Sequence, residues 1–220
     1  MSEPPNTSAL EEVRCDPSSR KRFLRALGGG AAASLAGALA ACGGGKPAGN
    51  QIGGAGVGSS QFGEGDAGVL NYALYLEYLE ADFYRLAVAS GNLRGRALDL
   101  ARRFGAEEQD HVVTLEGTVK GLGGTPAARP KPAFTLGSPS LILSTMNQLE
   151  TIGAAAYLGQ LDRIKSKQLL AVALAIHSVE ARHAAVISTM LGQPISPDGA
   201  FARPLTSVDV TAQIRPFVAG

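Results

Sequence analysis

Two glutamate–histidine pairs define the chemistry that this sequence could perform. Glu108 precedes His111 by three positions, and Glu180 precedes His183 by the same interval. Residues three apart in a helix lie on one face, so each pair can present a carboxylate oxygen and an imidazole nitrogen to a common point. Iron and manganese accept this mixture of ligands. Each pair therefore indicates one half of a metal-binding site.

A second set of residues precedes each pair at a matching distance. Glu77 is followed seven residues later by Tyr84, and Glu150 is followed seven residues later by Tyr157. The first glutamate precedes the second by 31 residues in one copy and by 30 in the other. This internal repeat predicts two equivalent helical hairpins. We expect the two glutamates to bridge or cap the metal site. The two tyrosines could donate to ligand carboxylates, carry an electron or radical, or simply pack and form hydrogen bonds in the core.

Six side chains would then converge from four helices, namely Glu77, Glu108, His111, Glu150, Glu180 and His183. Each lies on an apolar face, where an unpaired carboxylate is costly to remove from water. Four carboxylates nearly balance the charge of two divalent cations. Without metal, such a cluster would destabilise the protein or take up protons. We therefore predict a site for two metal ions.

The elements that must position these ligands follow from the spacing of apolar residues. It predicts helices over 66–90, 93–120, 141–164 and 167–191, and a short helix over 207–214. Residues 121–140 are rich in Gly and Pro and must form a connection. Two hairpins joined by a longer connection predict an all-α, antiparallel four-helix bundle with a crossover between its second and third helices.

Residues 1–41 are predicted to be an export signal rather than part of the fold. Ser19 to Arg25 resembles the twin-arginine pattern Ser-Arg-Arg-x-Phe-Leu-Lys, although Lys21 replaces the second arginine. The Gly- and Ala-rich run that follows is weakly hydrophobic, which favours the twin-arginine route over Sec export. Residues 39–42 resemble the lipobox of bacterial lipoproteins, which predicts lipidation of Cys42.

Three further parts complete the predicted organisation: a Gly-rich tether over 42–65, the bundle over 66–192 and a tail over 193–220. A lipid anchor and a flexible tether hold a protein at a membrane without spanning it. We therefore expect an exported protein of the cell envelope, periplasmic or on the outer surface. Its expected partners are the membrane, through the anchor, and metal ions.

Composition restricts the other partners. Five of the 20 basic and four of the 19 acidic residues precede residue 42, so the remainder is neutral and does not suggest a nucleic-acid partner. Cys15 lies in the predicted signal and Cys42 at the lipobox, so the bundle must fold without a disulfide. Iron–sulfur clusters are excluded for want of cysteines. The tether favours a monomer or small oligomer over a storage cage.

Residues 70–84 resemble the ferritin-like family of exported and desiccation-related proteins, through Leu-Asn-Tyr-Ala-Leu at their start and Leu-Glu-Ala-Asp-Phe-Tyr at their end. The resemblance spans all four helices. It implies that the six residues above are the ligands of two iron or manganese ions.

The resemblance also bears on the residues around the ligands. Residues 180–183 match the Glu-x-Arg-His motif found in many di-iron proteins. In that motif the arginine, here Arg182, does not bind metal but contacts the residues that do. The first hairpin has Asp110 at that place, and the two residues could pair. No haem is implied, because Gln109 stands where a bacterioferritin-type haem methionine would be.

Three residues beside the proposed ligands receive lesser roles. Glu80 lacks the seven-residue spacing to a tyrosine, and Glu107 is expected to be rotated away from the site into solvent. His177 is expected to be a satisfied boundary residue, with a seventh ligand as the alternative.

The function is left open between two classes. One is redox chemistry, either oxidation of Fe(II) by oxygen or peroxide or peroxide disproportionation. The other is a non-catalytic envelope protein of stress or desiccation, with a structural or vestigial metal site.

Overall fold

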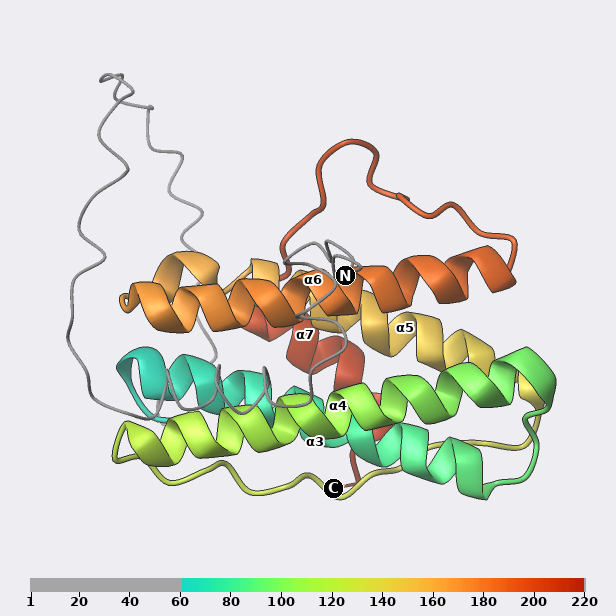
Figure 1. Cartoon of the computed structure of the whole chain (residues 1–220), viewed down its shortest axis with the longest axis horizontal. Coiled ribbons are helices and arrows are strands. Elements are labelled where there is room, and N and C mark those ends of the chain that lie inside the picture. The colour runs from blue at the N-terminus through green and yellow to red at the C-terminus, as the bar shows by residue number, and fades with distance from the viewer. Residues whose placement is uncertain (1–60, 220) are drawn as a thin grey trace, which may run out of the picture. The chain divides into compact units, whose positions relative to one another are not determined.

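A computed structural model describes residues 61–219 of the chain, and the regular elements among these residues are helices (Figure 1). Their elements are α3 (Gly65–Ala89), α4 (Gly95–Gly121), α5 (Pro139–Leu158), η1 (Leu161–Arg163), α6 (Lys167–Met190), α7 (Ser207–Ile214) and η2 (Arg215–Phe217). The predicted export signal, Cys42 and most of the predicted tether lie outside the described residues.

The four long helices form two hairpins. α3 packs along α4, and α5 packs along α6, with a short connection in each pair. The segment 122–138 returns along the bundle and brings the start of α5 to the end at which α4 begins (Figure 1). The predicted all-α bundle with a crossover between its second and third helices is confirmed. The third helix is shorter than predicted, because α5 ends at Leu158 and η1 follows it.

Local sequence signals explain where these helices begin. Ser138 accepts a hydrogen bond from the backbone of Leu141 at the start of α5, and Pro139 occupies the first helical position. Ser166 caps α6 in the same way by accepting from Leu169. Between α3 and α4, Gly91 adopts a positive φ of 68°, which a residue with a side chain rarely does.

Helix α3 is buried on nearly all sides, so it does not show the single apolar face that the spacing suggested. The crossover covers the side that faces away from the other helices. Asn71 donates to the carbonyl of Thr125 and accepts from the backbone of Ala127. Arg129 of the crossover pairs with Asp82. These contacts hold the crossover on α3 and remove the helix from solvent.

The chain at each end of the bundle also packs on it. Phe62 lies in the predicted tether, yet its ring packs edge-on against the ring of Tyr72, with 5.7 Å between the ring centres. The packed part of the chain therefore begins before residue 66. At the other end, Val210 and Ile214 of α7 enter the core. Beyond α7, the backbone of Phe217 accepts from Ala133 in the crossover.

Helix α6 is, among the described residues, the one helix long and apolar enough to cross a membrane by length and composition. Two of its ionisable side chains, Glu180 and His183, are buried inside the bundle. Of its most apolar stretch, 33% is buried, so packing against the core accounts for part of that composition.

Candidate metal centre

Carboxylate and imidazole groups from all four long helices meet inside the bundle. They form two overlapping groups, in each of which the potential ligand atoms lie within 4.8 Å of one another. The first group is Glu77, Glu108, His111 and Glu180, and the second is Glu108, Glu150, Glu180 and His183. Glu108 and Glu180 belong to both groups. The arrangement could therefore hold two metal ions with these two carboxylates between them and one further glutamate capping each end.

His111 is surrounded by carboxylate oxygens on one side. Its Nδ1 lies 2.9 Å from Oε2 of Glu108, 3.2 Å from Oε2 of Glu77 and 3.3 Å from Oε1 of Glu180. A ring nitrogen carries at most one proton and cannot satisfy three acceptors. A cation bound between these side chains would explain why three carboxylate oxygens converge on one ring nitrogen.

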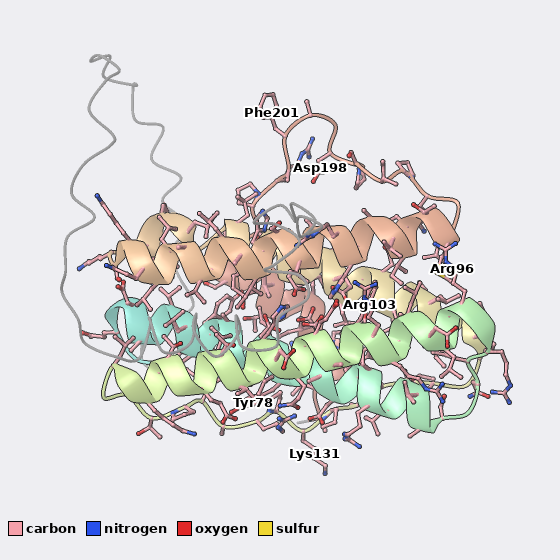
Figure 2. All side chains as sticks on the ribbon, in the orientation of Figure 1. Tyr78, Arg96, Arg103, Lys131, Asp198 and Phe201 are labelled. Atoms are coloured by element: carbon pink, nitrogen blue, oxygen red, sulfur yellow. The ribbon has the colours of Figure 1, made fainter. Side chains whose placement is uncertain are left out.

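His183 is held from both of its ring nitrogens. Nδ1 lies 3.0 Å from Oε1 of Glu108 and 3.1 Å from Oε2 of Glu150, whereas Nε2 lies 2.7 Å from Oε2 of Glu107. Arg103 in turn donates to Glu107 over 3.1 Å, and Figure 2 places Arg103 on the side of α4 next to α6. The expectation that Glu107 points into solvent is wrong, because α6 passes beside that face of α4.

A carboxylate on the second nitrogen fixes the ring of a metal-binding histidine and makes it a stronger ligand. Glu107 is suited to this role towards His183. The spacing of Arg103 and Glu107, four residues apart on one face of a helix, was the available signal. That spacing is also common on solvent-exposed helix surfaces, so by itself it does not point to the site.

The two tyrosines of the repeat connect the hairpins. Tyr157 of α5 donates to Oε1 of Glu77 over 2.6 Å, and Tyr84 of α3 donates to Glu150. Burial raises the pKa of both phenols well above the ordinary value, and the nearby carboxylates raise it further. Both tyrosines therefore keep their protons and donate to carboxylates of the centre, which is one of the roles that the sequence left open.

Glu80 is also part of the interior, although the sequence gave it a minor place. Only 3% of the residue is exposed, and its carboxylate lies against Gly153 of α5. Burial raises the pKa of Glu80 well above its usual range, and the charge of Glu180 adds to this effect. The available signal was Gly153 itself, a glycine inside a helix at the position that corresponds to Glu80 in the repeat.

The centre takes up protons when no cation is bound. Burial raises the pKa of Glu108 and Glu180 to about 8 and that of Glu150 to about 7, with help from neighbouring carboxylates. Burial would also raise the pKa of Glu77, but the charge of His111 and the hydrogen bonds from His111 and Tyr157 together outweigh it, and the pKa is lowered. Burial alone would lower the pKa of His183, yet the surrounding carboxylates raise it to about 11.

The donor set fits a pair of cations. Within residues 61–219, three buried carboxylate oxygens make no hydrogen bond of good geometry: Oε1 of Glu108 and both oxygens of Glu180. Two of them lie near a histidine nitrogen that other carboxylate oxygens also approach. Buried polar atoms are normally satisfied, so three such atoms in the two shared carboxylates indicate a missing binding partner. Carboxylate and imidazole ligands from four helices suit iron or manganese.

The remaining sequence-based assignments concern residues outside the two groups. Nδ1 of His177 bonds with the carbonyl of Ala154 over 3.0 Å, which agrees with a satisfied boundary residue. Arg182 is exposed and donates to the carbonyl of Ser178. The pairing of Arg182 with Asp110 stays a prediction.

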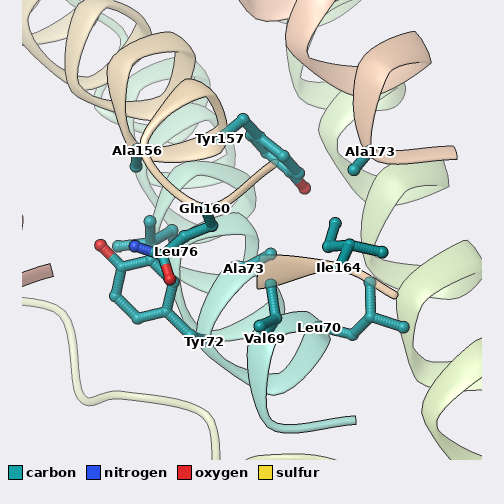
Figure 3. Close-up of a pocket in the computed structure, with 10 residues that line it drawn as sticks. All are labelled: Val69, Leu70, Tyr72, Ala73, Leu76, Ala156, Tyr157, Gln160, Ile164 and Ala173. Carbon is teal, nitrogen blue, oxygen red and sulfur yellow. The ribbon is translucent and has the colours of Figure 1, made fainter. Parts of the chain in front are cut away.

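Each connecting tyrosine adjoins a hollow. Tyr157 lines a small pocket whose other walls are mostly aliphatic, including Leu70 and Ile164 (Figure 3). Tyr84 lies beneath a surface groove of about 610 Å³, lined in part by Arg102 and Arg129. Both hollows therefore lie one side chain away from a carboxylate of the centre.

Comparison with known families identifies the class of domain to which the bundle belongs. The model of the ferritin-like domain family matches residues 65–193. The chain therefore belongs to the ferritin-like domain family. No curated protein matches the chain.

Proposed function

We propose that this chain is an exported protein that binds two iron or manganese ions and is redox-active towards Fe(II), oxygen or peroxide. The observation that carries the proposal is the pair of overlapping groups that share Glu108 and Glu180. These shared carboxylates would hold two ions next to each other. Two such ions supply the two electrons that, with two protons, reduce oxygen to hydrogen peroxide or peroxide to two waters.

The protein side chains have distinct tasks in this proposal. Glu77 and Glu150 cap the two metal positions, and each is oriented by a tyrosine of the other hairpin. Glu107 orients the ring of His183. Because Tyr84 and Tyr157 stay protonated, they hold a proton beside the ligand carboxylates without adding negative charge.

The central experiment is metal analysis of protein purified without chelator and loaded aerobically with Fe(II) or Mn(II). We expect about two ions per chain. Oxygen consumption during Fe(II) addition, and peroxide consumption by the loaded protein, then report the redox activity. Protein that retains no transition metal after this treatment would refute the proposal.

A non-catalytic role is the second candidate, and one observation favours it. The ligands come from all four long helices, so two bound ions would clamp both hairpins together. A clamp predicts two ions per chain and a large rise in thermal stability, with no oxygen or peroxide consumption above that of free metal. The same two assays therefore separate the candidates.

The proposed location follows from the N-terminal sequence. Cys42 would carry a lipid, and a tether would connect it to a bundle that remains a monomer or small oligomer. Cys42→Ser should release the protein from the membrane fraction and leave the precursor uncleaved. Unchanged fractionation and unchanged mass of the mature protein would show that the anchor is absent.

A further inference from the structure

The groove above Tyr84 lies outside the metal centre and has the size of a ligand site. Its volume is about 610 Å³, and residues of α3, α4 and the crossover line it. Sites for small organic molecules usually measure roughly 300–1,000 Å³. Three of the lining residues, Ala81, Ala101 and Gly105, have a small side chain or none. Space is therefore left open where α3 and α4 pack together.

The groove carries an excess of positive charge. Three guanidinium groups line it from three separate segments: Arg85 from α3, Arg102 from α4 and Arg129 from the crossover. Among the described residues that line the groove, Asp82 is the one acid. The chain beyond residue 41 is neutral as a whole, so this excess is local. Like charges gathered at one hollow attract anions to it.

Asp82 holds two of the three arginines in place. Its Oδ1 accepts from Nη2 of Arg85 over 3.1 Å, and its Oδ2 lies 3.1 Å from Nη1 of Arg129. The guanidinium of Arg129 also lies over the ring of Tyr78, 4.3 Å from its centre. A guanidinium has five N–H donors, and these contacts use only some of them. Both arginines are therefore oriented in advance and keep donors for a ligand.

Arg102 supplies a third cation that is not paired. It is exposed and forms no ion pair or side-chain hydrogen bond with the other residues of 61–219. Gln109, two helical turns further along α4, adds an amide to the same groove. A ligand with several anionic groups would complete this arrangement, because one group could bind the oriented arginines while another binds Arg102.

We propose that this groove binds a small organic molecule that carries two or more carboxylate or phosphate groups. The planar fork of arginine matches the paired oxygens of both kinds of group. Val88 and Ala101 offer apolar contacts to the body of such a molecule. The ring of Tyr84 lies between the groove and Glu150, so the ligand remains outside the centre. The inference goes beyond the proposed function and does not rest on it, since it requires no bound ion.

The test is calorimetric titration of the full chain with two probes, benzene-1,3,5-tricarboxylate and fructose 1,6-bisphosphate. The carboxylates of the first probe are too far apart to bind one metal ion together, so its binding does not report on the centre. We expect one molecule to bind per chain, and the probe that binds more tightly identifies the preferred anionic group. Arg102→Gln should lower that affinity about 10-fold or more, the usual effect of losing a hydrogen bond to a charged group. Because Arg102 has no partner among residues 61–219, this variant should fold normally.

Arg96→Gln is the matched control. It removes the same charge from an exposed position on α4 that does not line the groove (Figure 2). Its affinity for the probe should equal that of the unaltered chain. Equal losses in Arg96→Gln and Arg102→Gln would show unspecific attraction and overturn the proposal. An unaltered chain that binds neither probe also overturns it, whereas the metal content of the same samples tests the proposed function separately.

Discussion

The hydroxyl of Tyr157 lies 2.6 Å from Oε1 of Glu77, so a side chain of the second hairpin donates to a carboxylate of the first. The relationship is reciprocal, since Tyr84 of the first hairpin donates to Glu150 of the second. All four side chains are buried. The exchanged hydrogen bonds therefore join the hairpins at the centre and fix the direction in which each capping carboxylate points.

Replacing Tyr157 with phenylalanine should weaken the metal position at His111. The variant keeps the ring and leaves Oε1 of Glu77 without its donor, and loss of such an outer partner typically costs 10- to 100-fold in metal affinity. The metal-free protein should lose about 1–3 kcal/mol of unfolding free energy, because the bond is to a charged group. Metal titration and thermal unfolding measure the two effects. Tyr75→Phe is the control, since Tyr75 packs against Phe62 and is only half-buried; equal losses in both variants would contradict the prediction.

Replacing Glu107 with alanine should weaken the position at His183. The variant removes the partner of Nε2, so the ring loses its fixed orientation and its added basicity. We expect a loss of about 10-fold or more in the affinity of one of two bound ions, measured by stepwise titration. Glu116→Ala on the same helix should leave both affinities unchanged. Two weakened sites, or none, would show that Glu107 does not act through His183.

Much of the fold and the core of the candidate site follow from sequence spacing. Apolar residues at helical intervals define the four helices, and the repeat of Glu77 and Tyr84 in Glu150 and Tyr157 pairs the hairpins. Residues three apart must share a helical face whatever surrounds them. That is why both glutamate–histidine pairs are found together in the structure.

The surroundings of Glu80 and Glu107 could not be predicted from the sequence, for a different reason. Periodicity gives the direction of a side chain around its own helix, but it does not say which neighbour lies there. Glu107 meets His183 because α6 passes beside it. Glu80 is buried because its carboxylate lies against Gly153 of α5, a neighbour that the periodicity of α3 does not reveal.

The three histidines should differ in their effect on metal binding. His111→Ala and His183→Ala each remove one of the two imidazoles of the centre, whereas His177→Ala removes a bond to the carbonyl of Ala154. We expect either of the first two variants to lose one bound ion by elemental analysis, and the third to keep two. If His177→Ala caused the largest loss of metal, the ligands assigned on α6 would be wrong, and the true ones would lie nearly one helical turn earlier.

The stability of the metal-free protein should fall as the pH rises from about 5.5 to 8. The pKa of Glu108 and Glu180 is about 8 in the folded protein and that of Glu150 is about 7, against an ordinary value of 4.5. In this range the folded state therefore binds more protons than the unfolded state, and unfolding becomes easier as protons are withdrawn. His183, with a pKa raised from 6.5 to about 11, acts in the same direction above pH 6.5.

Metal loading should reverse this trend, because cations take the place of the protons. The lowered pKa of Glu77 adds no slope here, since a carboxylate with a depressed pKa makes its full contribution above its unfolded value of 4.5. We expect the Tm of the metal-free protein to fall between pH 5.5 and 8, and the difference between the loaded and metal-free Tm to widen. Glu108→Gln, which removes one of the titrating groups, should flatten the metal-free curve, whereas Glu116→Gln on the same helix should not. A metal-free Tm that rises over this range would mean that the buried carboxylates are ionised without a cation, and the interior would then need another source of positive charge.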